Sequence, residues 1–243
     1  MTILLSPSVG GTLITYSSVF GDIMANLSGV PDVVLNFYMN KVAIDLCERA
    51  KVWRVNYGAL PLTQGTYVNG VQTVIAPTTY YVTSPVANTE LSAILLAKNY
   101  LTTANDWQPL DIVTTEQVFE VAPDWPSING SGQPVAVTRL DEASIAVVPA
   151  PDNNDTYTIY LYCAIRPTLT ATTIDSTIYA TYRRAIYHGV LHELFMMPKK
   201  PWTDTDRAKY HGAQWEFMVN SARARANKSF GRANLTVVPQ PWA

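Results

Sequence analysis

Charged side chains are scarce in this 243-residue chain. Lys, Arg, Asp and Glu together make up 15% of it, whereas 48% of the residues are apolar. The composition is that of a globular protein, and the chain is long enough to bury a sizeable core. The share of charged residues is low for a free-standing soluble monomer, and the chain also contains six Trp and fourteen Tyr. We therefore expect protein partners to cover part of the surface.

Cysteines and long apolar runs are scarce as well. Cys47 falls in a predicted helix and Cys163 in a predicted strand, so we interpret both as small core residues of a protein from a reducing compartment. No apolar stretch reaches the roughly 18 residues that a membrane span needs. Residues 1–5 carry no basic region and form only a short apolar run, so no signal peptide is predicted.

Only three histidines occur, and all of them lie in the last third of the chain. His188 and His192 have the i,i+4 spacing that can bind a metal on one helical face. Glu193 follows the second histidine, however, and is not at the position of the base in a His-Glu-x-x-His metalloprotease motif. We interpret these histidines, with His211, as packing or interface residues. No metal or cofactor site is predicted.

Other catalytic patterns are also lacking. Nothing in the sequence pairs the carboxylates into the acid/base couple of a glycosidase; the candidates are Asp106, Asp111, Glu116 and Glu120. Ser131 lies between two glycines but outside a Gly-x-Ser-x-Gly elbow, and no glycine-rich phosphate loop occurs. The sequence therefore predicts no catalytic residue, and we expect a protein that is not an enzyme.

Three long helices are predicted, at about residues 31–51, 177–197 and 204–228. Pro31 and Asp32 suit the first turn of the first helix, and Thr203-x-x-Asp206 resembles a capping box before the last one. The helix at 177–197 is apolar around most of its circumference, so it should be buried on most sides. Because one small domain could fail to cover it, an oligomer is a reasonable expectation. An extended arm over residues 1–15 and a short helix over 17–27 precede these helices.

Strand and turn signals dominate residues 52–167. The clearest strand is 157–165, where apolar and polar residues alternate, and Asn69-Gly70 predicts a hairpin turn. Residues 91–100 fit either a short helix or a buried strand, whereas 112–121 have strand character. We expect an antiparallel sandwich or barrel-like insertion of roughly six to eight strands.

These elements predict an α+β fold. A helical bundle, built from the N-terminal helices and a C-terminal helix pair, is interrupted by a long antiparallel β-rich insertion. We divide the chain into an N-terminal arm with helices (1–57), the insertion (58–170), the C-terminal helix pair (171–232) and an extended docking tail (233–243).

The charge is divided unevenly along the chain. Residues 58–175 contain three Lys or Arg against eleven Asp or Glu, whereas residues 183–232 contain ten against four. Such a division indicates two different neighbours or one segment that faces a polyanion, although ordinary solvated faces would give the same count. No DNA- or RNA-binding signature accompanies the basic residues. Contact with passing DNA or with an acidic protein surface stays open.

Three segments carry a resemblance to a known family. They are LNFYMNKVAIDLCERAKVWR at residues 35–54, the stretch from GSGQPVAVTR to CAIRPT at 130–168, and YRRAIYHGVLHELFMMPKKPW with the basic helix that follows, up to residue 232. Their order resembles the head-to-tail adaptors, or connectors, of short-tailed, podovirus-type bacteriophages. In that family a first long helix, a β-rich insertion and a closing helix pair follow one another.

The resemblance implies a structural virion protein at the head-tail interface, assembled in the host bacterial cytoplasm. Such adaptors form a twelve-fold ring that joins the portal protein to the tail nozzle and lines the channel for DNA ejection. The implied partners are therefore the portal, the nozzle and further copies of the chain, with non-specific DNA contact and no membrane. The residues that match the portal-proximal end are Arg223, Arg225, Lys228, Arg232 and Trp242.

Two other classes of protein compete with this hypothesis. The chain could be a different neck or tail-completion protein of a phage. Alternatively, a carbohydrate-binding β-sandwich module of a tail could use exposed aromatic residues such as Trp107 and Trp125, although the helical third of the chain argues against it. A metal hydrolase would require His188, His192 and a third ligand to converge.

Overall fold

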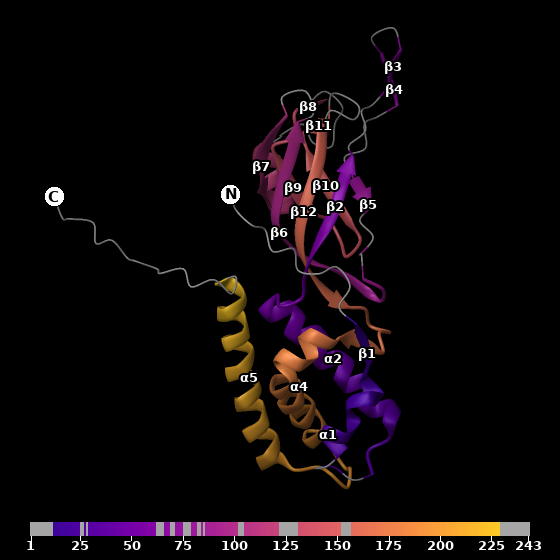
Figure 1. The fold of residues 1–243 in the computed structure, drawn as a ribbon, viewed down its shortest axis with the longest axis vertical. Helices are drawn as coiled ribbons and strands as arrows, with labels where there is room; N and C mark the ends of the chain where they lie inside the picture. The colour runs from indigo at the N-terminus through magenta and orange to yellow at the C-terminus, as the bar shows by residue number, and fades with distance from the viewer. Residues whose placement is uncertain are drawn as a thin grey trace, which may run out of the picture.

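The computed structural model describes residues 12–24, 27, 29–61, 66–68, 71–74, 79–81, 84, 86–101, 105–121, 131–151 and 157–228. Figure 1 shows an elongated molecule with helices at one end and a curled sheet at the other. The fold is α+β, as the sequence predicts, and helices from the early and the late part of the chain pack together.

The helical unit consists of α1 (Phe20–Met24), α2 (Asp32–Ala50), α4 (Ser176–Phe195) and α5 (Thr205–Asn227). A 3-10 turn (Tyr16–Val19) precedes α1. The predicted long helices are confirmed to within one or two residues at their ends. Strand β1 (Leu13–Thr15) pairs antiparallel with β13 (Thr173–Asp175), just before α4. Residues 1–11 of the predicted arm lie outside the described residues.

Aspartates start both helices of the C-terminal pair. Asp175 Oδ1 accepts hydrogen bonds from the amides of Thr177 and Ile178, at 2.8 and 3.0 Å. Asp204 does the same for the amides of Asp206 and Arg207 in α5, so it satisfies orphan donors of the first turn. The prediction that Thr203 caps α5 is therefore wrong by one residue.

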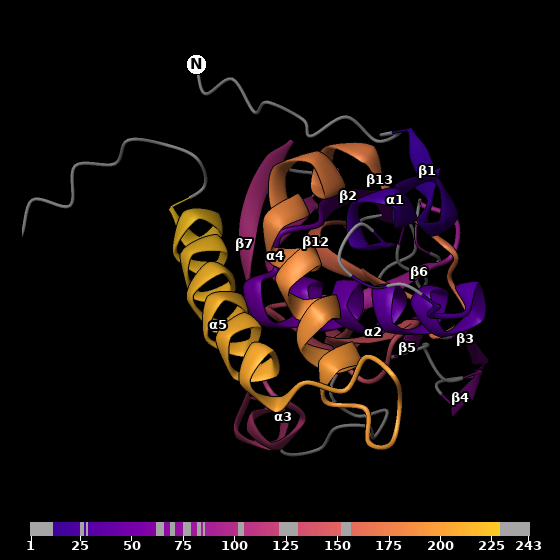
Figure 2. The ribbon, with the colours of Figure 1, turned by 90° about the horizontal axis from the view of Figure 1, so that it is seen from below.

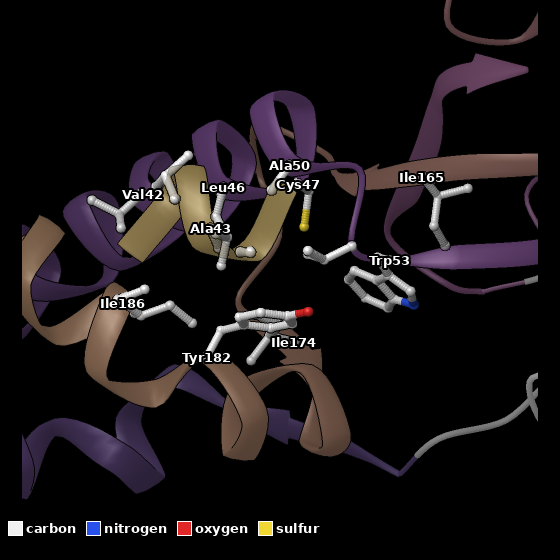
Figure 3. Close-up of a cluster of buried hydrophobic side chains, with 14 of the residues drawn as sticks. Val42, Ala43, Leu46, Cys47, Ala50, Trp53, Ile165, Ile174, Tyr182 and Ile186 are labelled. Atoms are coloured by element: carbon white, nitrogen blue, oxygen red, sulfur yellow. The ribbon is translucent and has the colours of Figure 1, made fainter. Parts of the chain in front are cut away.

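The apolar side of helix α4 is buried inside a single copy of the chain. It packs against α2, α5 and α1, and Figure 3 shows Tyr182 and Ile186 of α4 facing Val42, Ala43 and other residues of α2. Figure 2 shows α5 running along one side of α4. No oligomer is therefore required to cover this helix.

Gly189 allows the close approach of these three helices. A methyl group added at its Cα would lie 2.6 Å from Val42 Cγ1 in α2 and 2.9 Å from Trp215 Cε3 in α5. Both neighbours are buried core side chains, so neither can move away without disturbing the packing. A glycine is therefore needed at the point where α4 crosses α2 and α5.

The β unit is built around one seven-stranded sheet, ordered β2-β12-β6-β7-β9-β10-β5. Its strands are β2 (Arg54–Pro61), β5 (Thr79–Tyr81), β6 (Thr89–Leu101), β7 (Asp106–Ile112), β9 (Ala136–Arg139), β10 (Ser144–Val148) and β12 (Tyr157–Pro167). Two short pairs accompany it: β3 (Thr66–Val68) with β4 (Val71–Val74), and β8 (Ser131–Gly132) with β11 (Ala150–Pro151). Strands β3 and β4, on either side of the predicted hairpin turn at residues 69–70, pair antiparallel, and the turn itself lies outside the described residues.

The sheet resolves the ambiguity at residues 91–100. This segment lies in β6, which pairs with β12 on one side and β7 on the other. The sheet is not antiparallel throughout, because β7 and β9 run parallel. The division at 57/58 stays a prediction, and β2 spans that boundary because it begins at Arg54.

Residues 112–121 contain a helix where a strand is predicted. Helix α3 spans Thr115–Val121. The Thr114 amide donates to Gln117 Oε1, while the Gln117 amide donates to Thr114 Oγ1, which is the reciprocal pattern of a capping box. Val118 of α3 is buried. The strand prediction is wrong because local capping and one buried contact outweigh the β propensity of the segment.

Arg166 and Trp53 connect the two units. The Arg166 guanidinium on β12 contacts Glu48 of α2, lies 2.8 Å from a Glu90 oxygen of β6 and lies 3.4 Å from Glu142. Nearby, the Ile165 amide donates to the Trp53 carbonyl at 2.8 Å, and Figure 3 shows both side chains beside the end of α2. The sheet is thus anchored to α2 by one ion cluster and a shared core.

The Gly189→Ala substitution tests the close helix crossing. We expect it to lower the free energy of unfolding by about 1–3 kcal/mol, because the new methyl group overlaps Val42 and Trp215 in a packed core. Urea denaturation followed by circular dichroism would measure the change. Gly21→Ala in α1 is the matched control, since an added methyl group there meets nothing within 4 Å. Equal stabilities of the two variants would contradict the close packing at Gly189.

Candidate docking surface at the C-terminal ends of α2 and α5

Helices α2 and α5 end side by side. They line a cleft of about 450 Å³, formed by Glu48, Arg49, Ala50 and Lys51 on one wall and Val219, Asn220, Arg223 and Asn227 on the other. Lys51 ends α2 in the left-handed conformation, with φ of 50°, and its amide donates to the Cys47 carbonyl at 2.9 Å. Two helix C-termini, whose carbonyl groups carry partial negative charge, therefore open onto one cleft.

Arg49 joins the two walls of this cleft. Its guanidinium donates to both carboxylate oxygens of Glu216 on α5, one of them at 2.9 Å, and lies 3.4 Å from Asp45. The hydrogen bond that Arg49 donates to Glu216 raises the pKa of Arg49, and the same bond lowers the pKa of the Glu216 carboxyl. Such a fork-to-fork pair is geometrically specific. Arg49 is thus engaged in holding α5 against α2.

Three further cations at these helix ends have no such partner among the described residues. Lys51, Arg223 and Lys228 are exposed, and no carboxylate lies within ion-pair distance of them in the part of the chain that the structure describes. Arg225 is also exposed and lies on the same last turns of α5. Cations at a helix C-terminus offset the dipole, but this group exceeds what two helix ends require. It forms a positive surface suited to an anionic partner.

Arg54 extends the positive surface toward the sheet. Its Nε donates to the Lys51 carbonyl at 2.8 Å, so it satisfies an orphan acceptor at the end of α2. Burial raises the pKa of the Tyr182 hydroxyl, while the positive charges of Arg225 and Arg54 act in the opposite direction. The charges of both guanidinium groups therefore act on this tyrosine of α4. We name Lys51, Arg54, Arg223, Arg225 and Lys228 the cationic end.

The structure describes three of the five predicted site residues. Arg223, Arg225 and Lys228 come together at the cationic end, whereas Arg232 and Trp242 lie outside the described residues. Sequence reasoning missed Lys51 and Arg54. The segment 49–54, Arg-Ala-Lys-Val-Trp-Arg, is a basic end of a predicted helix, which was an available signal. Only the folded chain shows that this segment lies next to α5.

The histidines join α4 to α5. The Nδ1 atoms of His188 and His211 lie 2.8 Å apart, and His192 Nδ1 lies 2.8 Å from the Ala208 carbonyl, to which it donates. The rings of Tyr187, Tyr210 and Phe195 surround the first pair. Among the described residues no group of three His, Cys, Asp or Glu side chains is arranged to hold a metal ion. The geometry is that of packing residues between helices.

The four carboxylates considered for acid/base chemistry lie in the β unit. Asp106 and Asp111 belong to β7, and Glu116 and Glu120 belong to α3, which follows it. All four are exposed. Within the described ranges, no helix has the length and apolar character of a membrane span.

The chain thus combines a split helical unit, a β insertion and a cationic end at the C-termini of α2 and α5. A family model described as SU10 adaptor protein matches residues 11–237. Because this match spans nearly the whole chain, the chain belongs to the SU10 adaptor protein family. It is a phage adaptor family, in agreement with the head-to-tail adaptor resemblance, and this makes the chain a structural component of a virion. No curated protein matches the chain.

The histidine pair predicts a pH dependence of stability. Burial lowers the pKa of His188 and of His211, and nearby positive charges (Arg184 for the first; His188, Arg207 and His192 for the second) lower them further. As the pH falls through 6.5, the ordinary value, the unfolded chain binds protons before the folded chain does. The free energy of unfolding should therefore fall from pH 6.5 toward the lowered pKa values.

Urea denaturation at a series of pH values between about 7 and about 5, around the ordinary histidine pKa, measures this dependence. In the His188→Gln, His211→Gln double variant the slope of stability against pH should become shallower, because two groups with lowered pKa values are removed. A slope equal to that of the unmodified chain would show that the pair does not control it.

Proposed function

We propose that the protein is a head-to-tail adaptor that forms a dodecameric ring, joins the portal to the tail nozzle and lines the channel for DNA ejection. The observation that carries this proposal is the cationic end, where Lys51, Arg223 and Lys228 are exposed and have no carboxylate within ion-pair distance among the described residues. Membership of a structural adaptor family favours a role without catalysis. A restriction to short-tailed phages is part of the proposal.

Exposed apolar side chains on two helices support self-association. Val33 and Phe37 lie one turn apart on α2, and Tyr210 and Phe217 lie two turns apart on α5. All four are exposed although they are large and apolar. Two different patches on one subunit suit a head-to-tail contact, which closes into a ring when the rotation between copies permits it.

The cationic end supports contact with the portal. By resemblance, the last turns of α5 and the segment after them form the portal-proximal end, and Arg223, Arg225 and Lys228 are exposed there. Long-range attraction to an acidic portal surface would speed association and fall with ionic strength. The same cations could contact phosphates of passing DNA without reading its sequence. An adaptor that binds no portal under any condition would instead favour another neck or tail-completion role.

Charge reversal at the cationic end tests the portal contact. In the Arg223→Glu, Lys228→Glu variant we expect binding to purified portal to weaken at least about tenfold, because attraction becomes repulsion at the contact. Surface plasmon resonance at two salt concentrations would measure it. Lys199→Glu, Lys200→Glu is the matched control, since it makes the same charge change at exposed positions in the turn before α5. Equal losses in both variants would indicate a non-specific charge effect and refute the site.

Removal of residues 234–243 tests the role proposed for the docking tail. We expect the truncated chain to keep the helical content and unfolding transition of the full chain, because none of the described core residues is removed. Its attachment to portal rings should weaken, as judged by negative-stain microscopy and mass measurement. Full retention of portal binding would refute the docking role of the tail.

A further inference from the structure

The outward face of the sheet carries aromatic side chains where a solvated face would be polar. On β12, β6 and β7, alternate residues point to opposite sides of the sheet. Ile159, Ala97 and Leu110 on the inner side are buried. On the other side, Tyr160, Leu96 and Trp107 are 37%, 46% and 47% exposed. We name Tyr160, Leu96, Tyr100 and Trp107 the aromatic face.

Three rings of this face form one cluster across three strands. Tyr100 and Trp107 stand opposite each other in the β6–β7 register, with ring centroids 4.9 Å apart. Trp107 and Tyr160 have centroids 4.6 Å apart although β6 lies between their strands. Strands two apart in a sheet are about 10 Å from each other. The two side chains must therefore lean toward each other over β6, and the outer side of the cluster remains open to solvent.

Carboxylates without ion-pair partners lie on β7 and α3, next to this face. Asp111 is on the same side of β7 as Trp107, Asp106 precedes Trp107 and points to the opposite side, and Glu116 and Glu120 follow on α3. None of the four has a cation within ion-pair distance in the described ranges of the chain. Lys98 is the one cation of this sheet face in the same register, opposite Tyr160 and Pro109. The aromatic face thus combines open rings with an excess of negative charge.

We propose that the aromatic face takes an arginine- or lysine-bearing segment of the tail nozzle protein. This inference rests on the proposed adaptor function and assigns its tail-side contact. An indole face attracts a cation, and guanidinium groups also stack on aromatic rings. Trp and Tyr are the residues that most often dominate binding at protein interfaces. The negative charge disfavours DNA, and it disfavours the same partner surface that the cationic end would bind.

The location of the face suits a second partner. The aromatic face belongs to the sheet, whereas the cationic end lies at the C-terminal ends of α2 and α5, with Arg54 at the start of β2, so the two surfaces lie on different parts of the elongated molecule (Figure 1). One chain can then hold two neighbours of opposite charge. A positive neighbour binds the aromatic face and a negative neighbour binds the cationic end.

The test uses purified nozzle protein of the same phage, measured by biolayer interferometry on the full-length adaptor alone and on the adaptor bound to portal. Trp107→Ala should weaken nozzle binding at least about tenfold, as for a central interface aromatic, and should leave portal attachment unchanged. Asp106→Asn with Asp111→Asn should weaken it less and reduce its salt dependence. Leu169→Ala is the control, because it removes a side chain that is more exposed, at 85%, outside the sheet.

A tetra-arginine peptide should compete with the nozzle protein for the unmodified adaptor, whereas a tetra-glutamate peptide should not. Wild-type nozzle affinity of the Trp107→Ala variant would overturn the proposal. Loss of ring assembly in this variant with its nozzle affinity intact would also overturn it and would assign the face to a second copy. Competition by soluble oligosaccharides but not by tetra-arginine would overturn it as well. If the unmodified adaptor fails to bind portal, the proposed function is refuted instead. The aromatic face is then still tested by nozzle binding to the adaptor alone.

Discussion

The packing of α4 between α2 and α5 is the constraint on which the rest of the structure depends. Helix α2 comes from the early part of the chain, while α4 and α5 come from the late part, so the β unit must return the chain to its starting point. Strands β2 and β12 meet this requirement because they are neighbours in the sheet, one leaving α2 and the other leading back toward α4. The crossing at Gly189 tolerates no side chain, and the contact between distant segments is therefore close and specific.

Two arginines at the junctions are paired with carboxylates of the same chain. Arg166 gathers Glu48, Glu90 and Glu142 around one guanidinium, and Arg49 is bound by Glu216 across the helix pair. These arginines are occupied within the chain. Lys51, Arg223 and Lys228 of the cationic end, and the carboxylates of β7 and α3, have no ion-pair partner among the described residues, so the molecule presents charge of opposite sign on two separate surfaces. In a chain with so few charged residues, unpaired charge of this kind is best explained by partners.

The elements that the sequence predicted well are those with strong, local signals. The stripe Ala208, Trp215 and Ala222 on α5 is buried as its helical spacing predicts, and β12 shows the alternation expected for residues 157–165. The strand prediction for residues 112–121 is wrong, although Thr114 and Gln117 form a capping box that the sequence displays. Residues 91–100 could not be decided locally, since an apolar run of that length suits a buried strand or a helix until its neighbours are known.

By itself the sequence determined the helices, the β character of the insertion, the uneven charge and the family resemblance, because each depends on spacing or composition along the chain. Only the tertiary structure decided which of these features meet. Lys51 and Arg223 line one cleft, Arg54 donates to the Lys51 carbonyl, and Trp107 reaches Tyr160 across β6. The physical reason is that both contacts link residues far apart in sequence, through helix crossing and strand order, which no local pattern specifies. The candidate surfaces of the adaptor are therefore products of the fold, although their residues are visible in the sequence.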